Sequence, residues 1–265
     1  MKCIVDSRHE KVVFLFTKNN YNIYLCEKCK TIMAEVSFVH EQYESKDYYT
    51  VKYTEVKQIE KFWGFRFDYI LRKLSKYKIQ SILDVGAGNG FFVWKSRETL
   101  KIKSEGVEIA KNERDFAKKT FNIELNSDLN SCNTNYDALT LFNVIEHVED
   151  PYLLLNNLKN KIKPQGIIAI TTPNPKGFQR IFFGLKNWVM IMPPHHINIF
   201  SKQSLIEILE NVNFEILHYE TLNTYFCADF FTKYGTRFQI VRRIIMFIFR
   251  ILNIGADHFV IAKKL

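Results

Sequence analysis

A strand-like segment that runs directly into a glycine-rich turn constrains this chain more than any other feature. Residues 82–90 read ILDVGAGNG, and the glycines fall at every second position: Gly86, Gly88 and Gly90. The apolar residues of 79–85 predict a buried strand, and those from Phe91 onward predict a helix. Glycines at such a turn let backbone N–H groups approach a ligand closely, because no Cβ blocks them. The stretch therefore predicts an α/β fold with a ligand at this turn.

The spacing of this turn excludes two common nucleotide sites. A phosphate-binding loop needs Lys and then Ser or Thr after its last glycine, but Phe91 and Phe92 follow here. The dinucleotide fingerprint needs its third glycine at position 91, which is again Phe91. Asp84, two residues before the first glycine, would repel a pyrophosphate. An acid there favours a ligand with positive charge, such as an amino group or a sulfonium.

The run DVGAGNG resembles motif I of the class I S-adenosylmethionine-dependent methyltransferases. The resemblance implies that Glu108, at the end of the predicted strand 103–109, accepts hydrogen bonds from the ribose hydroxyls of the cofactor. It also implies that Asp128 accepts from the adenine amino group and that Asn143 lies beside the cofactor or the transferred methyl. The cofactor-binding residues expected for S-adenosylmethionine are Asp84, Gly86, Ala87, Gly88, Gly90, Glu108, Ile109, Asp128, Leu129 and Asn143.

Strands and helices alternate after this turn, which predicts an α/β fold with a doubly wound, mostly parallel, Rossmann-like sheet. The family resemblance implies seven strands. We expect them at 79–85, 103–109, 122–125, 136–144, 167–172, 214–221 and 257–264. Helices are expected at 110–120 and from Pro151, and Ser201 is expected to cap a further helix.

The first 40 residues predict a small separate unit. Strands are expected at 11–16 and 21–25, around the turn TKNN. Four side chains have the spacing of a zinc ribbon with one ligand changed to Asp, and they are Cys3, Asp6, Cys26 and Cys29. His9 is an alternative fourth ligand, and a ribbon that has lost its metal is the alternative to structural zinc. The segment resembles the zinc-ribbon-like unit that precedes some methyltransferases of sugar and secondary metabolism.

The sequence predicts three domains: the ribbon-like unit 1–40, a connecting helical segment 41–77 and the methyltransferase domain 78–265. Helical spacing of apolar residues predicts a helix over 56–74. Tyrosines at 48–53 either pack or cover the ligands. Lid insertions are expected near 174–200 and 222–255, because neither follows the α/β repeat.

The predicted catalytic residues are histidines. His196 and His195 follow two prolines, and relatives with an H-x-x-x-F-S pattern match His196. We expect His196 to be the general base, with His195 second, and His147 to act on the substrate. The alternative is that they only hold the structure together. Residues 137–175 resemble ubiquinone-pathway O-methyltransferases, some of which hold a divalent cation. Asn143 stands in place of their first acid, which argues against a catalytic metal here.

Composition bounds the partners. The net charge of +9 favours acidic partners such as phosphorylated metabolites, nucleic acid or an anionic membrane surface, and the alternative is a solvated basic surface. Together with this charge, the ribbon-plus-methyltransferase resemblance implies a small anionic or sugar-like acceptor. O-methyl transfer is favoured over N or C. The predicted pathway is cell-surface polysaccharide or secondary metabolism. The predicted amphipathic helix 238–252 contacts the domain, a second subunit or a membrane surface. The N-terminal residues contain no apolar signal region, which predicts a cytoplasmic protein, and five cysteines argue against a disulfide framework. The alternatives are an RNA-modifying enzyme, although nucleic acid is disfavoured, and a non-catalytic cofactor-binding protein.

Overall fold

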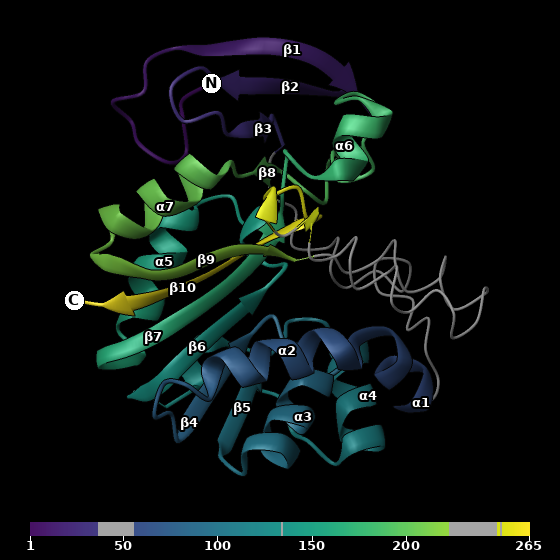
Figure 1. Ribbon diagram of the computed structural model, residues 1–265, viewed down its shortest axis with the longest axis vertical. Helices are drawn as coiled ribbons and strands as arrows, with labels where there is room; N and C mark the ends of the chain where they lie inside the picture. The colour runs from purple at the N-terminus through teal and green to yellow at the C-terminus, as the bar shows by residue number, and fades with distance from the viewer. Residues whose placement is uncertain (37–55, 134, 223–247, 250) are drawn as a thin grey trace. The chain divides into compact units, whose positions relative to one another are not determined.

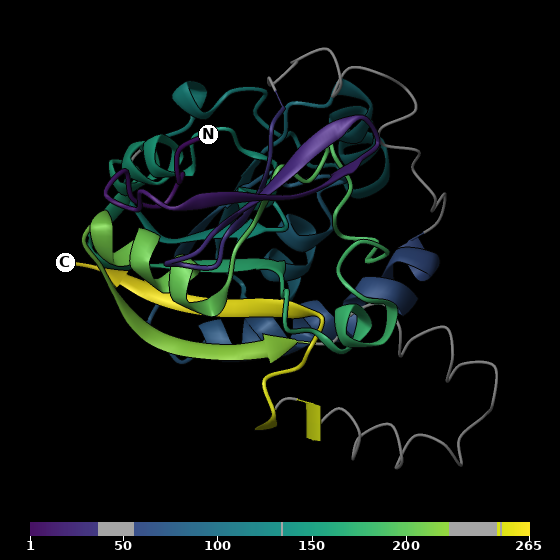
Figure 2. The ribbon, with the colours of Figure 1, turned by 90° about the horizontal axis from the view of Figure 1, so that it is seen from above.

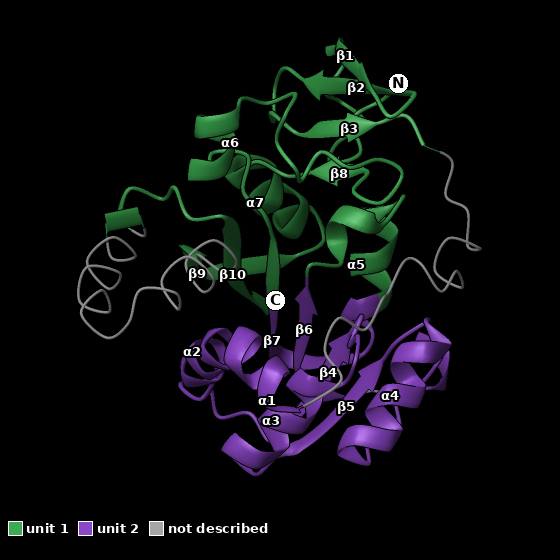
Figure 3. Cartoon of the chain, turned by 90° about the vertical axis from the view of Figure 1, so that its right-hand side faces the viewer, with its two compact units in different colours: residues 1–38, 143–157, 170–265 green, residues 39–142, 158–169 purple. Residues whose placement is uncertain are grey.

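The computed structural model describes residues 1–36, 56–133, 135–222, 248–249 and 251–265, and Figure 1 shows their helices and strands. The chain divides into two compact units, coloured in Figure 3. Unit 1 comprises residues 1–38, 143–157 and 170–265, and unit 2 comprises residues 39–142 and 158–169. The domain boundaries expected from the sequence, at 40 and 77, stay predictions.

Unit 2 is built on parallel strands with helices against them. The strand β4 (Ser81–Val85) pairs in parallel with β5 (Lys103–Val107) and with β6 (Tyr136–Phe142). The helices of unit 2 are α1 (Val56–Ile59), α2 (Phe65–Leu74), α3 (Phe91–Leu100) and α4 (Lys111–Phe121), all labelled in Figure 1, and a π-helical turn (Glu60–Gly64) joins the first two. The central strands are buried on both faces, as a parallel sheet covered by helices requires. The strand-turn-helix predicted at 79–91 is confirmed.

Among the described residues, the main sheet has six strands in the order β5-β4-β6-β7-β10-β9. The remaining members are β7 (Ile162–Pro173), β9 (Phe214–Leu222) and β10 (Asp257–Lys264). β9 and β10 are antiparallel and run side by side in Figure 2. The mostly parallel, Rossmann-like α/β class is thus confirmed.

The expectation of a seventh strand at 122–125 is wrong for the described residues. This segment contributes one isolated bridge, between Asn126 and Val107. The chain then turns at Asp128, whose side chain caps a 3-10 turn (Leu129–Ser131), so the pairing with β5 stops.

The N-terminal residues of unit 1 form a second sheet in the order β1-β2-β3-β8. Its strands are β1 (Val12–Lys18), β2 (Tyr21–Cys26), β3 (Ile32–Ala34) and β8 (Asn198–Ile199). The predicted hairpin is confirmed, and Asn19 and Asn20 at its tip both have positive φ angles, 50° and 65°. Two such residues match the twist of antiparallel strands.

The segment 174–200 supplies this small sheet with its core. Trp188 and Ile191 are buried against Ile23, Ile32 and Ile199. The same segment contains α6 (Phe178–Phe183) and β8, which pairs with β3. The aromatic and methionine-rich composition of the predicted lid is therefore explained in part by packing on the N-terminal strands.

The remaining helices of unit 1 are α5 (Pro151–Lys159), the 3-10 turn η4 (Ile145–His147) and α7 (Lys202–Asn211). The Ser201 side chain accepts a hydrogen bond from the Ser204 N–H at 3.0 Å, so the predicted cap of α7 is confirmed. The tyrosines at 48–53 and most of the predicted helix 238–252 lie outside the described residues. Within the described ranges, no helix has the length and apolar character needed to cross a membrane.

Candidate functional site

The glycine turn of unit 2 is held by its backbone and leaves space at its centre. The N–H groups of Gly86 and Ala87 both donate to the carbonyl of Val107, at 2.9 and 2.8 Å. Gly88 has φ +51°, and a Cβ added there would meet nothing within 4 Å. The turn is therefore anchored to the end of β5 while Gly88 faces open space, as a ligand-binding turn requires.

Gly90 is needed for helix packing. Its φ is +76°, and a Cβ added there would lie 2.8 Å from the Cβ of Ala117 on α4. The missing side chain lets the start of α3 approach α4 closely. Gly90 is thus needed for packing next to the turn rather than for access to it.

Asp84 is the penultimate residue of β4, inside the sheet, and is 3% exposed. Its carboxylate accepts a hydrogen bond from Thr140 Oγ1 at 2.5 Å. Burial raises the pKa of Asp84 to about 7; the Thr140 hydrogen bond opposes this and the nearby Glu108 charge adds to it. A cation bound nearby would therefore stabilise the ionised carboxylate of Asp84.

Glu108 follows β5 directly and is also 3% exposed. Its two oxygens accept from the N–H groups of Gly88 and Ala110, each at 2.8 Å. Burial raises the pKa of Glu108 above its ordinary value, although these two hydrogen bonds oppose the change. Because a carboxylate offers about four acceptor positions, the fixed group can still receive two hydroxyl donors.

A third acid, Glu113, was missed by the sequence analysis. It is buried on α4, where burial and the Glu108 charge raise its pKa to about 7. The signal that could have found it is its spacing. Glu113 stands four residues before buried Ala117, so the inward face of this helix carries an acid next to the glycine turn.

Asp128 occupies a more exposed position. It accepts from the backbone and side chain of Asn130, at 3.1 and 3.3 Å. Two residues earlier, the carbonyl of Asn126 accepts from the Glu108 N–H at 2.9 Å, so this stretch runs beside the end of β5. Ile109 is 40% exposed, and Leu129 is half-buried.

These residues fit a cationic nucleoside ligand. Burial raises the pKa of all three acids, Asp84, Glu108 and Glu113, and the Glu108 charge raises the pKa of the other two further. A ligand with positive charge would offset that cost, and the open side of Gly88 gives it room. S-adenosylmethionine carries both a sulfonium and an ammonium group, and so matches this donor set.

A separate polar group lies in unit 1 around Glu146, which is fully buried. Glu146 accepts from Asn143 Nδ2 at 3.2 Å and from Thr172 Oγ1 at 2.9 Å. Asn143, which has φ +57°, also accepts from Thr171 Oγ1 at 3.3 Å. Asn143, which the sequence predicts to bind the cofactor, therefore belongs to the hydrogen-bonded group around Glu146.

Two of the predicted histidines stand beside Glu146. The rings of His147 and His196 are 4.7 Å apart, edge to face. His147 Nδ1 donates to the carbonyl of His195 and His196 Nδ1 to that of Met190, both at 2.8 Å. Since a carbonyl can only accept, each Nδ1 carries the proton and each Nε2 keeps a lone pair.

Burial keeps these histidines neutral. It lowers the pKa of His147 to about 4, and burial together with the His147 charge lowers the pKa of His196. The side chain of His195 is not part of the group, although its carbonyl orients His147. Glu146, His147 and His196 offer ligand atoms within 4.8 Å of one another, so they could accept a proton or hold a divalent cation.

The predicted ribbon residues also meet within unit 1. Cys3, Cys26 and Cys29 converge, and the fourth member of the group is His9. Asp6 is instead held by Arg8, whose N–H groups donate to both carboxylate oxygens. These hydrogen bonds lower the pKa of Asp6 below its ordinary value.

Comparison with known proteins points in the same direction. A family model described as a methyltransferase domain matches residues 56–219. Ubiquinone biosynthesis O-methyltransferase from Rickettsia typhi is 30% identical over 174 residues, which cover 57% of this chain and 68% of that protein. The enzyme of the same name from Haemophilus ducreyi is 25% identical over 143 residues, 48% of this chain. The match spans 61% of that relative's length, which is less than two thirds.

Solved structures share the fold. An S-adenosylmethionine-dependent methyltransferase from Archaeoglobus fulgidus has a TM-score of 0.52 at 24% identity, covering 76% of this chain and 97% of that one. Another from Mesorhizobium loti has a TM-score of 0.53 at 18% identity, covering 74% and 96%. At these identities the likeness is one of fold.

Proposed function

The chain belongs to the S-adenosylmethionine-dependent methyltransferase family, and from this premise we propose that it transfers a methyl group to a hydroxyl oxygen of a small molecule. The observation that carries the proposal is the set of buried acids, Asp84, Glu108 and Glu113, beside the open glycine turn. When bound, S-adenosylmethionine supplies an electrophilic methyl group on its sulfonium.

Different residues of the chain contact different parts of the cofactor. Asp84 offsets its positive charge, and Glu108 receives the ribose hydroxyls on the two acceptor positions that its backbone contacts leave. Asp128 accepts from the adenine amino group. Ile109 and Leu129 offer apolar surface to the adenine ring. Gly86, Ala87 and Gly88 shape the turn that admits the ligand, and Gly90 lets α3 begin close to α4.

His196 is the proposed general base. A hydroxyl group loses its proton when its oxygen is methylated, and a neutral imidazole can accept that proton. The donor contact from Nδ1 to the Met190 carbonyl fixes the lone pair on Nε2. His147 and Glu146 pack beside this ring and position it.

The same histidine favours one acceptor class. Burial lowers the pKa of His196 and makes it a weak base. A phenol has a pKa of about 10, as in tyrosine, and gives up its proton to a weak base far more readily than an aliphatic alcohol does. The relatives named as O-methyltransferases support an oxygen acceptor. We therefore favour a phenolic acceptor over the sugar or phosphorylated intermediate expected from the sequence, which stays a prediction.

The test is transfer of labelled methyl from S-adenosylmethionine to a panel of acceptors. It should include a catechol, its monomethyl ether, a simple glycoside, a sugar phosphate and RNA. We expect product from the catechol. Product from the glycosides alone would overturn the acceptor class. Cofactor binding without turnover on any acceptor would favour a non-catalytic protein, and turnover on RNA would favour an RNA-modifying enzyme.

A divalent cation on Glu146, His147 and His196 is the second candidate role for that group, and it rests on their 4.8 Å cluster. The two roles differ in one measurement. If His196 acts as a base, a chelator that leaves the zinc content of the chain unchanged also leaves turnover unchanged. If the group holds a cation, the chelator abolishes turnover and Mg²⁺ or Mn²⁺ restores it.

A further inference from the structure

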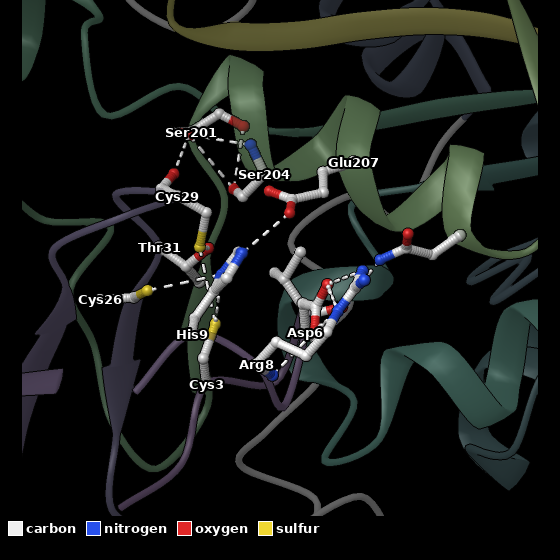
Figure 4. Close-up of polar contacts among 12 residues, drawn as sticks. Cys3, Asp6, Arg8, His9, Cys26, Cys29, Thr31, Ser201, Ser204 and Glu207 are labelled. Carbon is white, nitrogen blue, oxygen red and sulfur yellow. Dashed lines mark hydrogen bonds and ion pairs between the residues drawn. The ribbon is translucent and has the colours of Figure 1, made fainter. Parts of the chain in front are cut away.

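Four metal-binding side chains meet in unit 1 from two separated parts of the chain. Cys3 and His9 precede the first hairpin, and Cys26 and Cys29 lie at and just after the end of β2. Figure 4 shows the three sulfurs gathered around one edge of the His9 ring. All four side chains are buried, with exposures of 6% or less. Cysteine is often buried without a metal, so the evidence for a metal here is the placement of the four ligand atoms.

Three of the six distances between the ligand atoms match the edges of a coordination tetrahedron, and all six are within 4.8 Å. Cys3 Sγ lies 3.6 Å from Cys29 Sγ and 3.5 Å from His9 Nδ1, and Cys26 Sγ lies 3.7 Å from the same nitrogen. With Zn–S of about 2.3 Å and Zn–N of about 2.0–2.1 Å, a regular tetrahedron separates two sulfurs by about 3.8 Å and sulfur from nitrogen by about 3.6 Å. A disulfide between Cys3 and Cys29 would need about 2.05 Å. The sulfurs are therefore placed for a shared metal ion and not for a disulfide.

We propose that Cys3, His9, Cys26 and Cys29 bind a structural zinc ion, with His9 coordinating through Nδ1. Three thiolates and an imidazole in a tetrahedron suit zinc better than harder cations, which prefer oxygen ligands. The four protein ligands fill the coordination sphere, so the site is closed and structural. The ligand set differs from the expectation that Asp6 replaces a cysteine, because Asp6 is held by Arg8.

The groups around the cluster fit this assignment. His9 Nε2 lies 2.9 Å from Glu207 Oε1 on α7. With Nδ1 on the metal, the proton must sit on Nε2 and face that carboxylate, which is the usual outer partner of a metal-bound histidine. Thr31 Oγ1 lies 3.2 Å from Cys29 Sγ and can donate to a thiolate there.

The site would fasten the N-terminal strands to α7. Besides the contact of Glu207 with His9, the hydroxyl of Ser201 donates to the Cys29 carbonyl at 2.6 Å. Asn211 Nδ2 donates to the Val5 carbonyl at 3.3 Å. Three positions along or beside α7 thus hold the segments that carry the ligands, as Figure 4 shows for the first two. Loss of the metal should loosen this attachment as well as the ribbon.

The first measurement is the metal content of the purified full chain by mass spectrometry. We expect about one zinc per chain, a value near zero in Cys26→Ser, and an unchanged value in Cys132→Ser, which removes a buried cysteine outside the cluster. Asp6→Asn should also keep its zinc. Near-zero zinc in the native chain after growth with added zinc would overturn the proposal. Zinc retained in Cys26→Ser but lost in Asp6→Asn would overturn the ligand set.

A second measurement avoids variants that fail to fold. The native chain is exchanged into Co²⁺, and its absorption spectrum is recorded. Thiolate-to-cobalt charge-transfer bands together with intense tetrahedral ligand-field bands are expected, and a spectrum of octahedral, oxygen-ligated cobalt would overturn the proposal. Glu207→Gln should keep these bands and weaken zinc affinity by about 10- to 100-fold. The inference does not depend on methyl transfer, so either proposal can fail alone.

Discussion

The charge of Asp84 gives the sharpest test of the cofactor site, because it should cost stability when no ligand is bound. Its ordinary pKa is 3.8, and burial raises it to about 7 in the folded chain. Folding therefore favours the protonated form. The stability is complete below about pH 4 and is lost as the pH rises through about 7. At 1.36 kcal/mol per pKa unit, the loss approaches about 4 kcal/mol at pH 8.

Asp84→Asn removes this charge and keeps an oxygen that can accept from Thr140. We expect the ligand-free variant to be more stable than the native chain by up to about 4 kcal/mol at pH 8, with the gain shrinking toward zero near pH 4. Binding should change in the opposite direction. A lost charge-assisted contact of about 1.5–3 kcal/mol weakens the affinity for S-adenosylmethionine by about 10- to 150-fold.

Urea denaturation at pH 5 and pH 8 measures the stabilities, and calorimetry with S-adenosylmethionine measures the binding. Asp137→Asn is the matched control. Burial raises the pKa of Asp137, but hydrogen bonds from Lys163, Gln80 and Ser81 outweigh it and lower the pKa, so this variant should lose stability at pH 8. The reasoning is refuted if Asp84→Asn gains no stability at pH 8, or gains it equally at pH 5, or binds the cofactor as tightly as the native chain.

Three further predictions concern the base and the packing. His196→Gln should lower kcat by about 10²- to 10⁴-fold in steady-state assays; because burial lowers the pKa of His196, native activity should decline with falling pH only below 6.5. Gly90→Ala should cost more stability in urea than Gly88→Ala, by about 1–3 kcal/mol, because only position 90 adds a clash to the positive φ. Trp188→Ala should cost about 3–5 kcal/mol in the same assay and loosen the small sheet.

Each of these has an outcome that contradicts it. Unchanged kcat in His196→Gln with the phenolic acceptor would remove the histidine from the mechanism, and His195→Gln is the control that should retain most activity. Equal losses in the two glycine variants would mean that α4 yields to the extra methyl group. Trp188→Phe should cost much less than the alanine variant, since Trp188 Nε1 makes no hydrogen bond within the described residues. A similar loss in both would show that the indole N–H matters after all.

The local sequence pattern was sufficient to predict the elements whose conformation depends on neighbouring residues. The alternation of apolar residues with turns marked β4, the glycine turn, α3 and the first hairpin, and the acids Asp84 and Glu108 could be placed from their distance to the turn. Each of these features rests on backbone conformation or on the end of a strand, which a short stretch of sequence specifies.

Other features arise from residues that meet only in three dimensions. The choice of His9 over Asp6 follows from where Cys26, Cys29 and Glu207 lie, and the N-terminal sheet draws its core from Trp188 far along the chain. Glu113 shares a face of α4 with Ala117 by its spacing, but it is the packing of Ala117 against Gly90 that shows this face to be buried. The segment 122–125 has the residues of a strand but forms one bridge, because the cap at Asp128 turns it away.

The sequence by itself therefore determined the fold class and, through its resemblance to a known family, the cofactor, since both rest on the short run of residues 82–90 and the acids spaced after it. Tertiary structure decided which buried side chains lie close together. It placed a third acid near Glu108, paired His147 with His196 beside Glu146, and supplied His9 as the fourth member of the cysteine cluster. The physical reason is that pKa changes and metal geometry depend on distances through space, which spacing along the chain does not fix.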